Sequence, residues 1–362
     1  MLNSIYRHIH WPITSAAIVM PIMLFGLMAI SSFGDINSLM YKQLIWILIS
    51  MSAIFIFANI KYSIMSRSAA SMGVYGLAGI LLMALFILGK VTNGAKSWLH
   101  IGLVSFQPAD LMKLALIMLL AKYFSKRHVE IANIKHLLIS GIYLAVPVIL
   151  VLLQPDLGSA VILIGIWFGM VLVSGASRKH VLFMIFMGIM TVLLSWLFLF
   201  KPYQKDRIIN FIHPLNDVRG SGYNAYQSTI AVGNGGLYGQ GVGYGSQSRL
   251  NYLPEHETDF IFAAFAEEWG YLGSLCLILL YMLLLFYLLK GVYNMKDNYA
   301  TLFISGVIVW FYIHIIINIG MNLGVSPVTG IPLPFMSYGG SHLLLESIAL
   351  GICSSMIYNN RR

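Results

Sequence analysis

The segment Leu253-Pro-Glu-His-Glu-Thr-Asp-Phe260 stands directly before a mostly apolar run that extends to Leu289. It places three carboxylates and a histidine beside apolar residues, in a chain where only 10% of residues are charged. The run exceeds the ~20 residues that a helix needs to cross a bilayer. Charge at the end of a membrane helix is costly unless it is solvated, paired or used in function. The pattern predicts a membrane helix with a functional site at its start, centred on Asp259.

The composition excludes an ordinary soluble protein. The 362 residues are 59% hydrophobic, whereas a soluble chain carries about a quarter charged residues. The formal net charge is +9, but no basic helix or aromatic-basic ladder accompanies it, so no nucleic-acid partner is expected. Cys276 and Cys353 both lie inside apolar runs, and they predict neither a disulfide nor a metal site.

The apolar pattern predicts an all-α polytopic membrane protein with ten transmembrane helices, forming a single integral membrane domain over residues 1–362. Lysine and arginine set the orientation: thirteen flank the side that holds both termini and eight the other side. Since the positive side faces inward, both termini are expected in the cytoplasm and lipid is expected around the bundle. The predicted spans are 12–32, 43–60, 71–89, 106–124, 137–153, 160–174, 181–200, 260–289, 300–322 and 342–358.

Two long segments between the predicted spans then lie outside the cell. The large extracytoplasmic loop between the seventh and eighth helices covers about 201–259 and is rich in glycine. Loops of this length are uncommon unless they are functional. Ile208–Ile212 and Gln227–Val232 are apolar enough for amphipathic pieces at the membrane interface. The second loop, Gly324–Ser341, contains three prolines, which suit a re-entrant or tightly folded plug.

Asp259 with Glu255 and Glu257 is the first candidate site. A carboxylate beside apolar surface and other carboxylates has a raised pKa, which suits a general base. The alternative is that Thr258 or Asp259 only caps the following helix. Glu267 and Glu268 follow two turns later. At about 100° per residue, Glu267 lies about 80° round from Asp259 and Glu268 opposite it, and both are expected to face the bundle and not lipid. A divalent cation could assist at this site, and its ligands are unknown.

Two further segments carry charge near predicted spans. Asp110 and Lys113 lie three residues apart on one helix face. They could form a buried ion pair that fixes helix packing, or Lys113 could be a cation that holds a phosphate or diphosphate. Asp156, in Gln154-Pro-Asp-Leu-Gly-Ser159, lies in a turn whose proline and glycine need no function. The histidines show no recognisable metal-ligand spacing.

Together these segments resemble the SEDS family (shape, elongation, division and sporulation), most closely its rod-shape branch. The resemblance covers nearly the whole chain and includes the ten-helix layout. The matching segments are Gln107–Lys113, Gln154–Gly158, Tyr203–Arg207, Gly220–Asn224, Gln227–Ser228, Leu253–Glu255, Thr258–Phe262, Ala266–Gly270 and Pro332–Gly340.

The resemblance implies an inverting peptidoglycan glycosyltransferase that polymerises lipid II on the outer face of the cytoplasmic membrane during elongation, releasing undecaprenyl diphosphate. It implies Asp259 as the catalytic residue. Substrate contacts are expected from Lys113, Asp110, Asp156, Glu255 and Arg207. It also implies a Mg²⁺ or Mn²⁺ cofactor. The expected partners are a class B penicillin-binding transpeptidase and the elongation proteins MreC and MreD.

Three positions depart from the family pattern. Glu257 stands where the family has a histidine, Asp110 where it has a glutamate, and His342 where it has a small residue. The rival function is a lipid II flippase. Polar residues near the outer ends of the helices favour an enzyme, because transporters bind near the membrane midplane between structural repeats. A third hypothesis, a purely structural scaffold for the transpeptidase, does not explain the charged residues Asp259 and Lys113.

Overall fold

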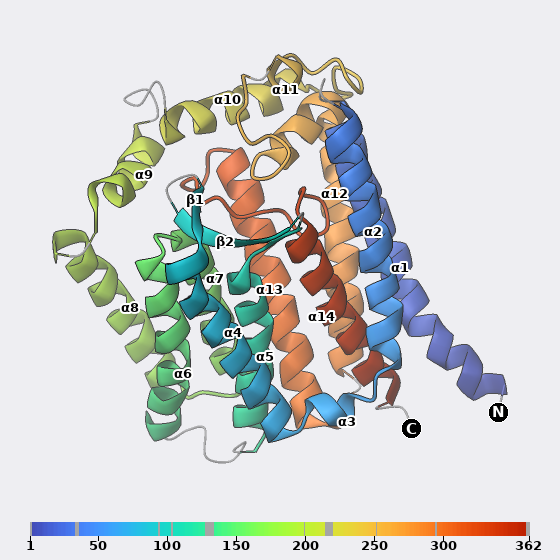
Figure 1. The fold of residues 1–362 in the computed structure, drawn as a ribbon, viewed down its shortest axis with the longest axis vertical. Coiled ribbons are helices and arrows are strands. Elements are labelled where there is room, and N and C mark those ends of the chain that lie inside the picture. The colour runs from blue at the N-terminus through green and yellow to red at the C-terminus, as the bar shows by residue number, and fades with distance from the viewer. Residues whose placement is uncertain are drawn as a thin grey trace.

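The computed structural model describes residues 2–32, 36–92, 95–102, 104–126, 134–198, 200–213, 220–250, 252–293 and 295–359. It is a bundle of helices with one small sheet (Figure 1). The long helices are α1 Leu2–Ser31, α2 Ile36–Asn59, α4 Ser68–Leu88, α5 Pro108–Ser125, α6 Ile134–Leu153, α7 Leu157–Val173, α8 Arg178–Phe198, α12 Ile261–Tyr293, α13 Asn298–Asn322 and α14 Gly340–Asn359. These coincide with the ten predicted spans, and the predicted fold class is confirmed.

The ten helices differ in how well they suit lipid. In the described part of the chain, eight of them are long and apolar enough to cross a membrane. The other two are α7, which is shorter, and α5, which carries Asp110, Lys113 and Lys122. Helix α5 is buried on nearly all sides and contacts α4, α7 and α13. A charged helix in a membrane protein must be enclosed by other helices, so α5 forms part of the centre of the bundle.

Helices α13 and α14 complete this centre. Helix α13 packs on α5, α7 and α12, while α14 packs on α2. In contrast, Met184 is the one residue of α8 that is buried, and its other apolar side chains are partly or fully exposed. An apolar helix with an exposed surface suits contact with lipid. The bundle therefore has a protein-enclosed core and a lipid-suited periphery.

The end of the bundle that carries the small sheet and three shorter helices is here called the loop end (Figure 1). There β1 Lys90–Thr92, β2 Ala95–Ile101 and β3 Val104–Phe106 form an antiparallel sheet in the order β1-β2-β3. The sequence pattern did not indicate this sheet. Helices α9 Pro202–Ile212, α10 Ser221–Asn234 and α11 Ser246–Arg249 lie across the same end, and short α3, Tyr62–Met65, lies at the opposite end.

The glycine-rich loop after α10 is fixed to the first turns of α12. The Glu267 carboxylate accepts hydrogen bonds from Ser246, Gln247 and Ser248, over 2.8–3.3 Å. The Glu268 carboxylate accepts the backbone N–H of Gly243 at 3.0 Å. Both glutamates are buried, so the prediction that they avoid lipid is confirmed. Their hydrogen bonds dock the loop.

Candidate functional site

Asp259 lies in the turn that leads into α12, and its backbone is held by α13. Its carbonyl accepts hydrogen bonds from the side-chain amides of Asn318, at 2.9 Å, and Asn322, at 3.1 Å. Asn322 also accepts the N–H of Ala263 at 3.0 Å. Each of these contacts satisfies a backbone group that a membrane helix end would otherwise leave unpaired. Asp259 is therefore fixed relative to two helices.

A second element holds the same turn from the other side. Residues 331–338, here called the clamp loop, connect the end of the α13 region to α14. The Ser337 hydroxyl donates to the carbonyl of Thr258 at 2.6 Å, and the Tyr338 N–H donates to the carbonyl of Glu257 at 2.8 Å. Its apolar residues Leu333 and Phe335 are fully buried, so the loop is the folded plug that its prolines predicted.

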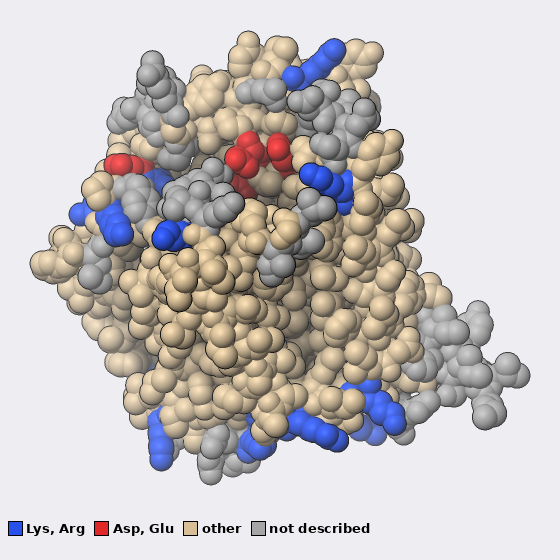
Figure 2. Space-filling model, viewed as in Figure 1, with Lys and Arg blue, Asp and Glu red and all other residues tan. Residues whose placement is uncertain are grey.

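The electrostatics of Asp259 suit a general base. Burial, and to a smaller extent the negative charges of Glu255 and Asp156, raise the pKa of Asp259 from its ordinary 3.8 to about 7, while the positive charge of Arg207 opposes this rise. These residues come from distant segments of the chain and lie within electrostatic range of one another. Figure 2 shows acidic side chains gathered in a hollow near the loop end. A base with a pKa near neutral is half deprotonated at physiological pH.

The immediate surroundings of Asp259 leave its carboxylate directed at the loop after α13. A methyl group placed on Gly330 would lie 3.3 Å from Oδ2 of Asp259. In the described part of the chain, neither Thr258 nor Asp259 caps α12 with its side chain; the Thr258 hydroxyl instead donates to Glu255 Oε2 at 3.1 Å. The helix-cap alternative is thus not supported. Glu257 lies 3.4 Å from His256 Nε2.

Asp110 and Lys113 form a second cluster within the bundle. Lys113 Nζ lies 2.7 Å from Asp110 Oδ1 and 3.4 Å from His314 Nε2. Lys113 is 3% exposed and Asp110 1% exposed, so the pair is desolvated. The indole N–H of Trp310 donates to the same His314 nitrogen at 3.0 Å. The geometry therefore agrees with an ion pair that fixes helix packing, and substrate binding by Lys113 and Asp110 stays a prediction.

Asp156 caps the N-terminus of α7. Its carboxylate accepts the N–H and the hydroxyl of Ser159, at 2.9 and 2.8 Å, and so caps α7. Gln107, at the start of α5, donates to the same carboxylate at 3.3 Å. This cap joins two of the family-like segments at the loop end. It also brings the Asp156 charge within range of Asp259.

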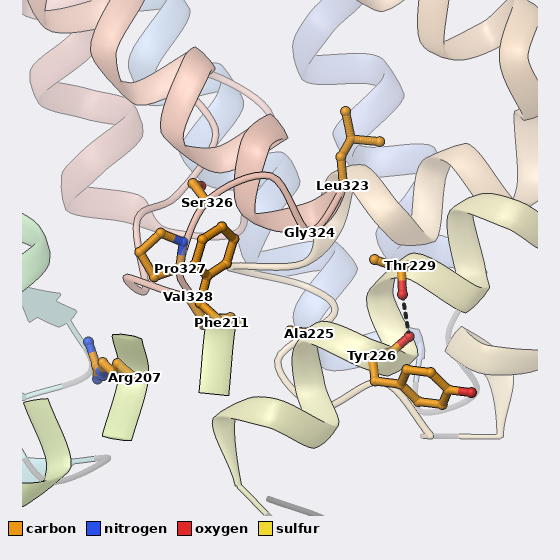
Figure 3. Close-up of a pocket in the computed structure, with 10 residues that line it drawn as sticks. All are labelled: Arg207, Phe211, Ala225, Tyr226, Thr229, Leu323, Gly324, Ser326, Pro327 and Val328. Carbon is orange, nitrogen blue, oxygen red and sulfur yellow. Dashed lines mark hydrogen bonds between the residues drawn. The ribbon is translucent and has the colours of Figure 1, made fainter. Parts of the chain in front are cut away.

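A groove opens beside the Asp259 turn, between α9, α10 and the loop after α13 (Figure 3). Its volume is about 140 Å³. The walls are largely apolar, from Phe211, Pro327 and Val328, and Arg207 contributes a positive charge. Val328 also packs on the small buried cluster that contains Phe260. An apolar groove with a basic group suits an amphiphilic anion.

Several residues in these contacts were not predicted. Asn318 and Asn322 hold the Asp259 turn, while His314, His342 and Glu346 lie beneath the clamp loop. All five are buried. The available signal was a polar residue in an apolar helix, and for His342 and Glu346 also a spacing of four on one helix face. The histidines do meet in space although their spacing showed no ligand pattern.

The comparisons with known proteins agree on one family. The family model described as "Cell cycle protein", which joins FtsW, RodA and SpoVE, matches residues 5–362. Stage V sporulation protein E of Bacillus subtilis is 36% identical, covering 86% of this chain and 84% of that protein. The probable peptidoglycan glycosyltransferase FtsW of Haemophilus influenzae is 34% identical, covering 94% and 88%. The peptidoglycan glycosyltransferase MrdB of Escherichia coli is 35% identical, covering 80% and 78%.

Solved structures give the same result. A chain from a peptidoglycan synthase complex that coordinates polymerization and crosslinking is 28% identical, with a TM-score of 0.85, covering 98% of this chain and 99% of that one. The rod-shape-determining protein RodA of Thermus thermophilus is 26% identical, with a TM-score of 0.74 and the same coverage. The chain therefore belongs to the FtsW, RodA and SpoVE family, the SEDS proteins. Its enzyme class is peptidoglycan glycosyltransferase.

Proposed function

We propose that this glycosyltransferase polymerises lipid II into glycan strands, with Asp259 as the general base. The observation that carries the proposal is a carboxylate with a pKa of about 7, on a turn whose backbone is held by α13 and the clamp loop, beside a groove with apolar walls and Arg207. Lipid II joins a polyprenyl chain to a sugar through a diphosphate. The groove matches that combination, because apolar walls suit the lipid and the guanidinium suits the diphosphate.

In the proposed reaction, Asp259 removes the proton from the 4-hydroxyl of the acceptor sugar. The oxygen attacks the anomeric carbon of the donor, whose bond to the diphosphate breaks, and undecaprenyl diphosphate leaves with the bonding electron pair. A single displacement inverts the anomeric centre. Arg207 and Lys113 are the cations proposed to bind the diphosphate. Glu255 raises the pKa of Asp259 and so keeps the base near neutral.

A Mg²⁺ or Mn²⁺ ion is a further part of the proposal. Mg²⁺ commonly takes one or two carboxylates together with substrate phosphates, and in this proposal the phosphate oxygens of the substrate hold the ion. When bound, the ion would neutralise charge on the leaving diphosphate.

Assignment to cell elongation is also proposed. The relatives include division and sporulation proteins as well as rod-shape proteins, while the run Gly245-Ser-Gln-Ser-Arg-Leu250 resembles the rod-shape branch. The similarity to a chain of a polymerising and crosslinking complex supports a class B penicillin-binding transpeptidase as partner. MreC and MreD are proposed as further partners, and a cytoplasmic membrane location with both termini inside is proposed from the charge distribution.

The test is polymerisation of labelled lipid II by the purified protein in detergent, with and without Mg²⁺ or Mn²⁺, and with the class B transpeptidase present. Glycan strands are expected from the wild type and none from Asp259→Asn. The rival flippase would instead move labelled lipid II across sealed vesicles without forming polymer. Translocation without polymer, under the conditions that include partner and cation, would reject the glycosyltransferase mechanism.

A further inference from the structure

The clamp loop is held from below by side chains of three helices. Tyr281 of α12 donates its hydroxyl to the Pro334 carbonyl at 2.7 Å, and His314 of α13 contacts the Pro332 carbonyl at 3.2 Å. Glu346 of α14 accepts the Phe335 N–H at 2.9 Å. Irregular backbone inside a membrane bundle requires such partners, because neither water nor lipid can supply them. The loop is thus fixed at three backbone positions, Pro332, Pro334 and Phe335.

Glu346 holds the position that most needs support. Phe335 has a φ of 60°, in the left-handed region that a bulky side chain rarely adopts. Its N–H donates to Glu346, while its ring lies fully buried beside Phe311. Two residues later, Ser337 accepts the N–H of Leu333 at 2.8 Å and donates to Thr258. Glu346 therefore reaches the Asp259 turn through one short stretch of loop.

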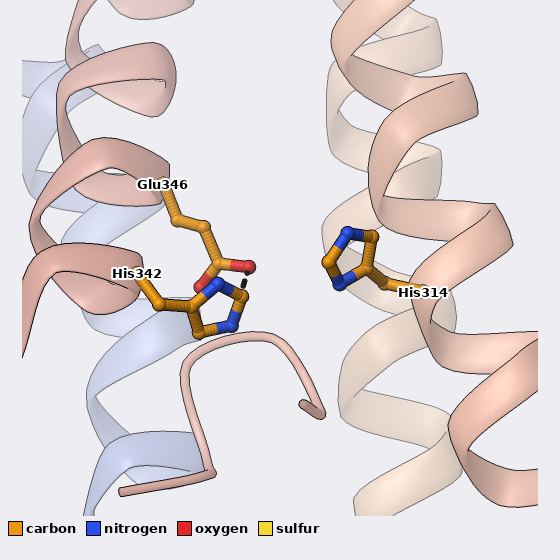
Figure 4. Close-up of side chains that lie close together, drawn as sticks. All are labelled: His314, His342 and Glu346. Atoms are coloured by element: carbon orange, nitrogen blue, oxygen red, sulfur yellow. Dashed lines mark ion pairs between the residues drawn. The ribbon is translucent and has the colours of Figure 1, made fainter. Parts of the chain in front are cut away.

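Glu346 also belongs to a cluster with His314 and His342, whose ligand atoms lie within 4.8 Å of one another (Figure 4). A metal ion is disfavoured there. The indole of Trp310 donates to Nε2 of His314, so Nε2 is the unprotonated nitrogen and Nδ1 donates to Pro332. Lys113 Nζ lies 3.4 Å from that same Nε2 and would repel a cation. His342 Nε2 lies 3.1 Å from Glu346 Oε1, without forming a hydrogen bond to it.

We propose that Glu346 is a positioning residue for glycosyl transfer: by accepting the Phe335 N–H it sets the clamp loop, and the loop sets the turn that carries Asp259. The inference rests on the proposed function of Asp259. Glu346 touches neither Asp259 nor the groove, so its effect passes through backbone contacts. Since misplacement of a reacting group by about 1 Å can cost ~10²-fold in rate, the loss should fall on kcat.

The experiment compares Glu346→Leu with Glu346→Gln in the lipid II polymerisation assay across pH. The leucine variant loses the acceptor and should lose kcat by about ten- to hundredfold, with KM within about twofold of wild type. A loosened turn lets water reach Asp259, so the acid limb of the pH–rate profile should move below about 7. The glutamine variant keeps an oxygen for the Phe335 N–H and should retain wild-type kcat and midpoint.

Two controls separate positioning from general destabilisation. Leu350→Ala removes a fully buried side chain from the same helix and should lower thermal stability without moving the pH midpoint. Ser337→Ala breaks the same connection at the other end of the loop and should reproduce the loss of kcat and the shift of the pH midpoint. It provides the test if Glu346→Leu fails to fold. A wild-type kcat and midpoint in Ser337→Ala or Glu346→Leu would overturn the inference, as would a bound metal that Glu346→Gln releases. If the wild type polymerises and Asp259→Asn does not, such a result rejects the inference alone.

Discussion

Asp259 carries the clearest prediction for a single residue, because its environment alters its proton affinity. As the proposed general base, Asp259 acts only when deprotonated, and its pKa is about 7, so the rate below that pH should fall about tenfold per unit. Asp259→Asn should lose polymerisation by ~10²–10⁴-fold. The measurements are the pH–rate profile of the wild type and the activity of the variant. A flat profile between pH 5 and 8 would contradict the base assignment.

The raised pKa of Asp259 also predicts how the folding stability of the protein depends on pH: deprotonation, which favours catalysis, lowers that stability. The folded chain holds the Asp259 proton with a pKa of about 7, against 3.8 for the ordinary group. The folded state therefore loses stability as pH rises from about 4 to 7, and the full penalty applies above 7. Asparagine has no such penalty. The melting temperature of Asp259→Asn relative to wild type should thus be higher at pH 8 than at pH 5; an unchanged difference would argue against a raised pKa.

Lys113 and Asp110 allow a double-variant test. Lys113→Met alone leaves a buried carboxylate without its cation, which typically costs about 3–5 kcal/mol of stability. Asp110→Leu with Lys113→Met removes both charges and should fold as well as wild type or better. If Lys113 binds the diphosphate, the double variant folds but stays inactive, and Lys113→Arg is impaired because a planar fork replaces a compact ammonium. Thermal stability and polymerisation are measured together; activity in the double variant would make Lys113 structural.

Among individual residues, the sequence identified those with unusual charge but not those that hold them. Asp259, Asp110 and Lys113 were found because a charge in an apolar context is conspicuous. Asn318 and Asn322 act through carbonyl groups of a segment about sixty positions away, and nothing local to either residue indicates that pairing. The substrate contact of Asp156 stays a prediction, and the structure adds a helix cap tied to Gln107 that the sequence did not indicate. Contacts between distant segments depend on the fold and need coordinates.

At the level of elements, the docking of the glycine-rich loop on α12 gives a matched pair of variants. Gly239 and Gly243 both have positive φ, of 84° and 79°, so alanine costs backbone strain at either position. A methyl group on Gly239 would meet the Glu268 carbonyl, whereas one on Gly243 would meet nothing within 4 Å. Gly239→Ala should therefore undock the loop and increase its cleavage by protease, with Gly243→Ala clearly less affected. Equal cleavage of the two variants would show that strain alone decides.

The elements themselves were predictable where one physical rule dominates. Bilayer thickness fixes the length of an apolar helix, so the ten spans could be located from the sequence. The sheet from Lys90 to Phe106 was missed because its strands have three to seven residues, which is too short for an alternating pattern to stand out. The clamp loop was expected to be folded, but the side chains that hold it lie on three different helices.

For the whole molecule, the distribution of charge predicts the orientation in the membrane. Figure 2 shows lysine and arginine along the edge opposite the loop end and also around the loop end, where acidic side chains accompany them. In this view the opposite edge carries positive charge alone, as expected if that edge is cytoplasmic. Tyr238 in the glycine-rich loop is 80% exposed and Tyr293 at the far end of α12 is 89% exposed. Both offer accessible positions for a single cysteine, in a background where exposed Cys276 and buried Cys353 are replaced by serine.

An impermeant maleimide added to intact spheroplasts should then label Tyr238→Cys, and should label Tyr293→Cys only after the membrane is opened. Two arguments give this expectation. The positive edge stays on the cytoplasmic side, and the proposed polymerisation outside the cell requires Asp259 and its groove to face outward. Labelling of Tyr293→Cys in closed spheroplasts, with Tyr238→Cys protected, would invert the topology. The inverted arrangement would place Asp259 in the cytoplasm, where glycan strands are not assembled, and would reject the proposed function even if the turn proved chemically active.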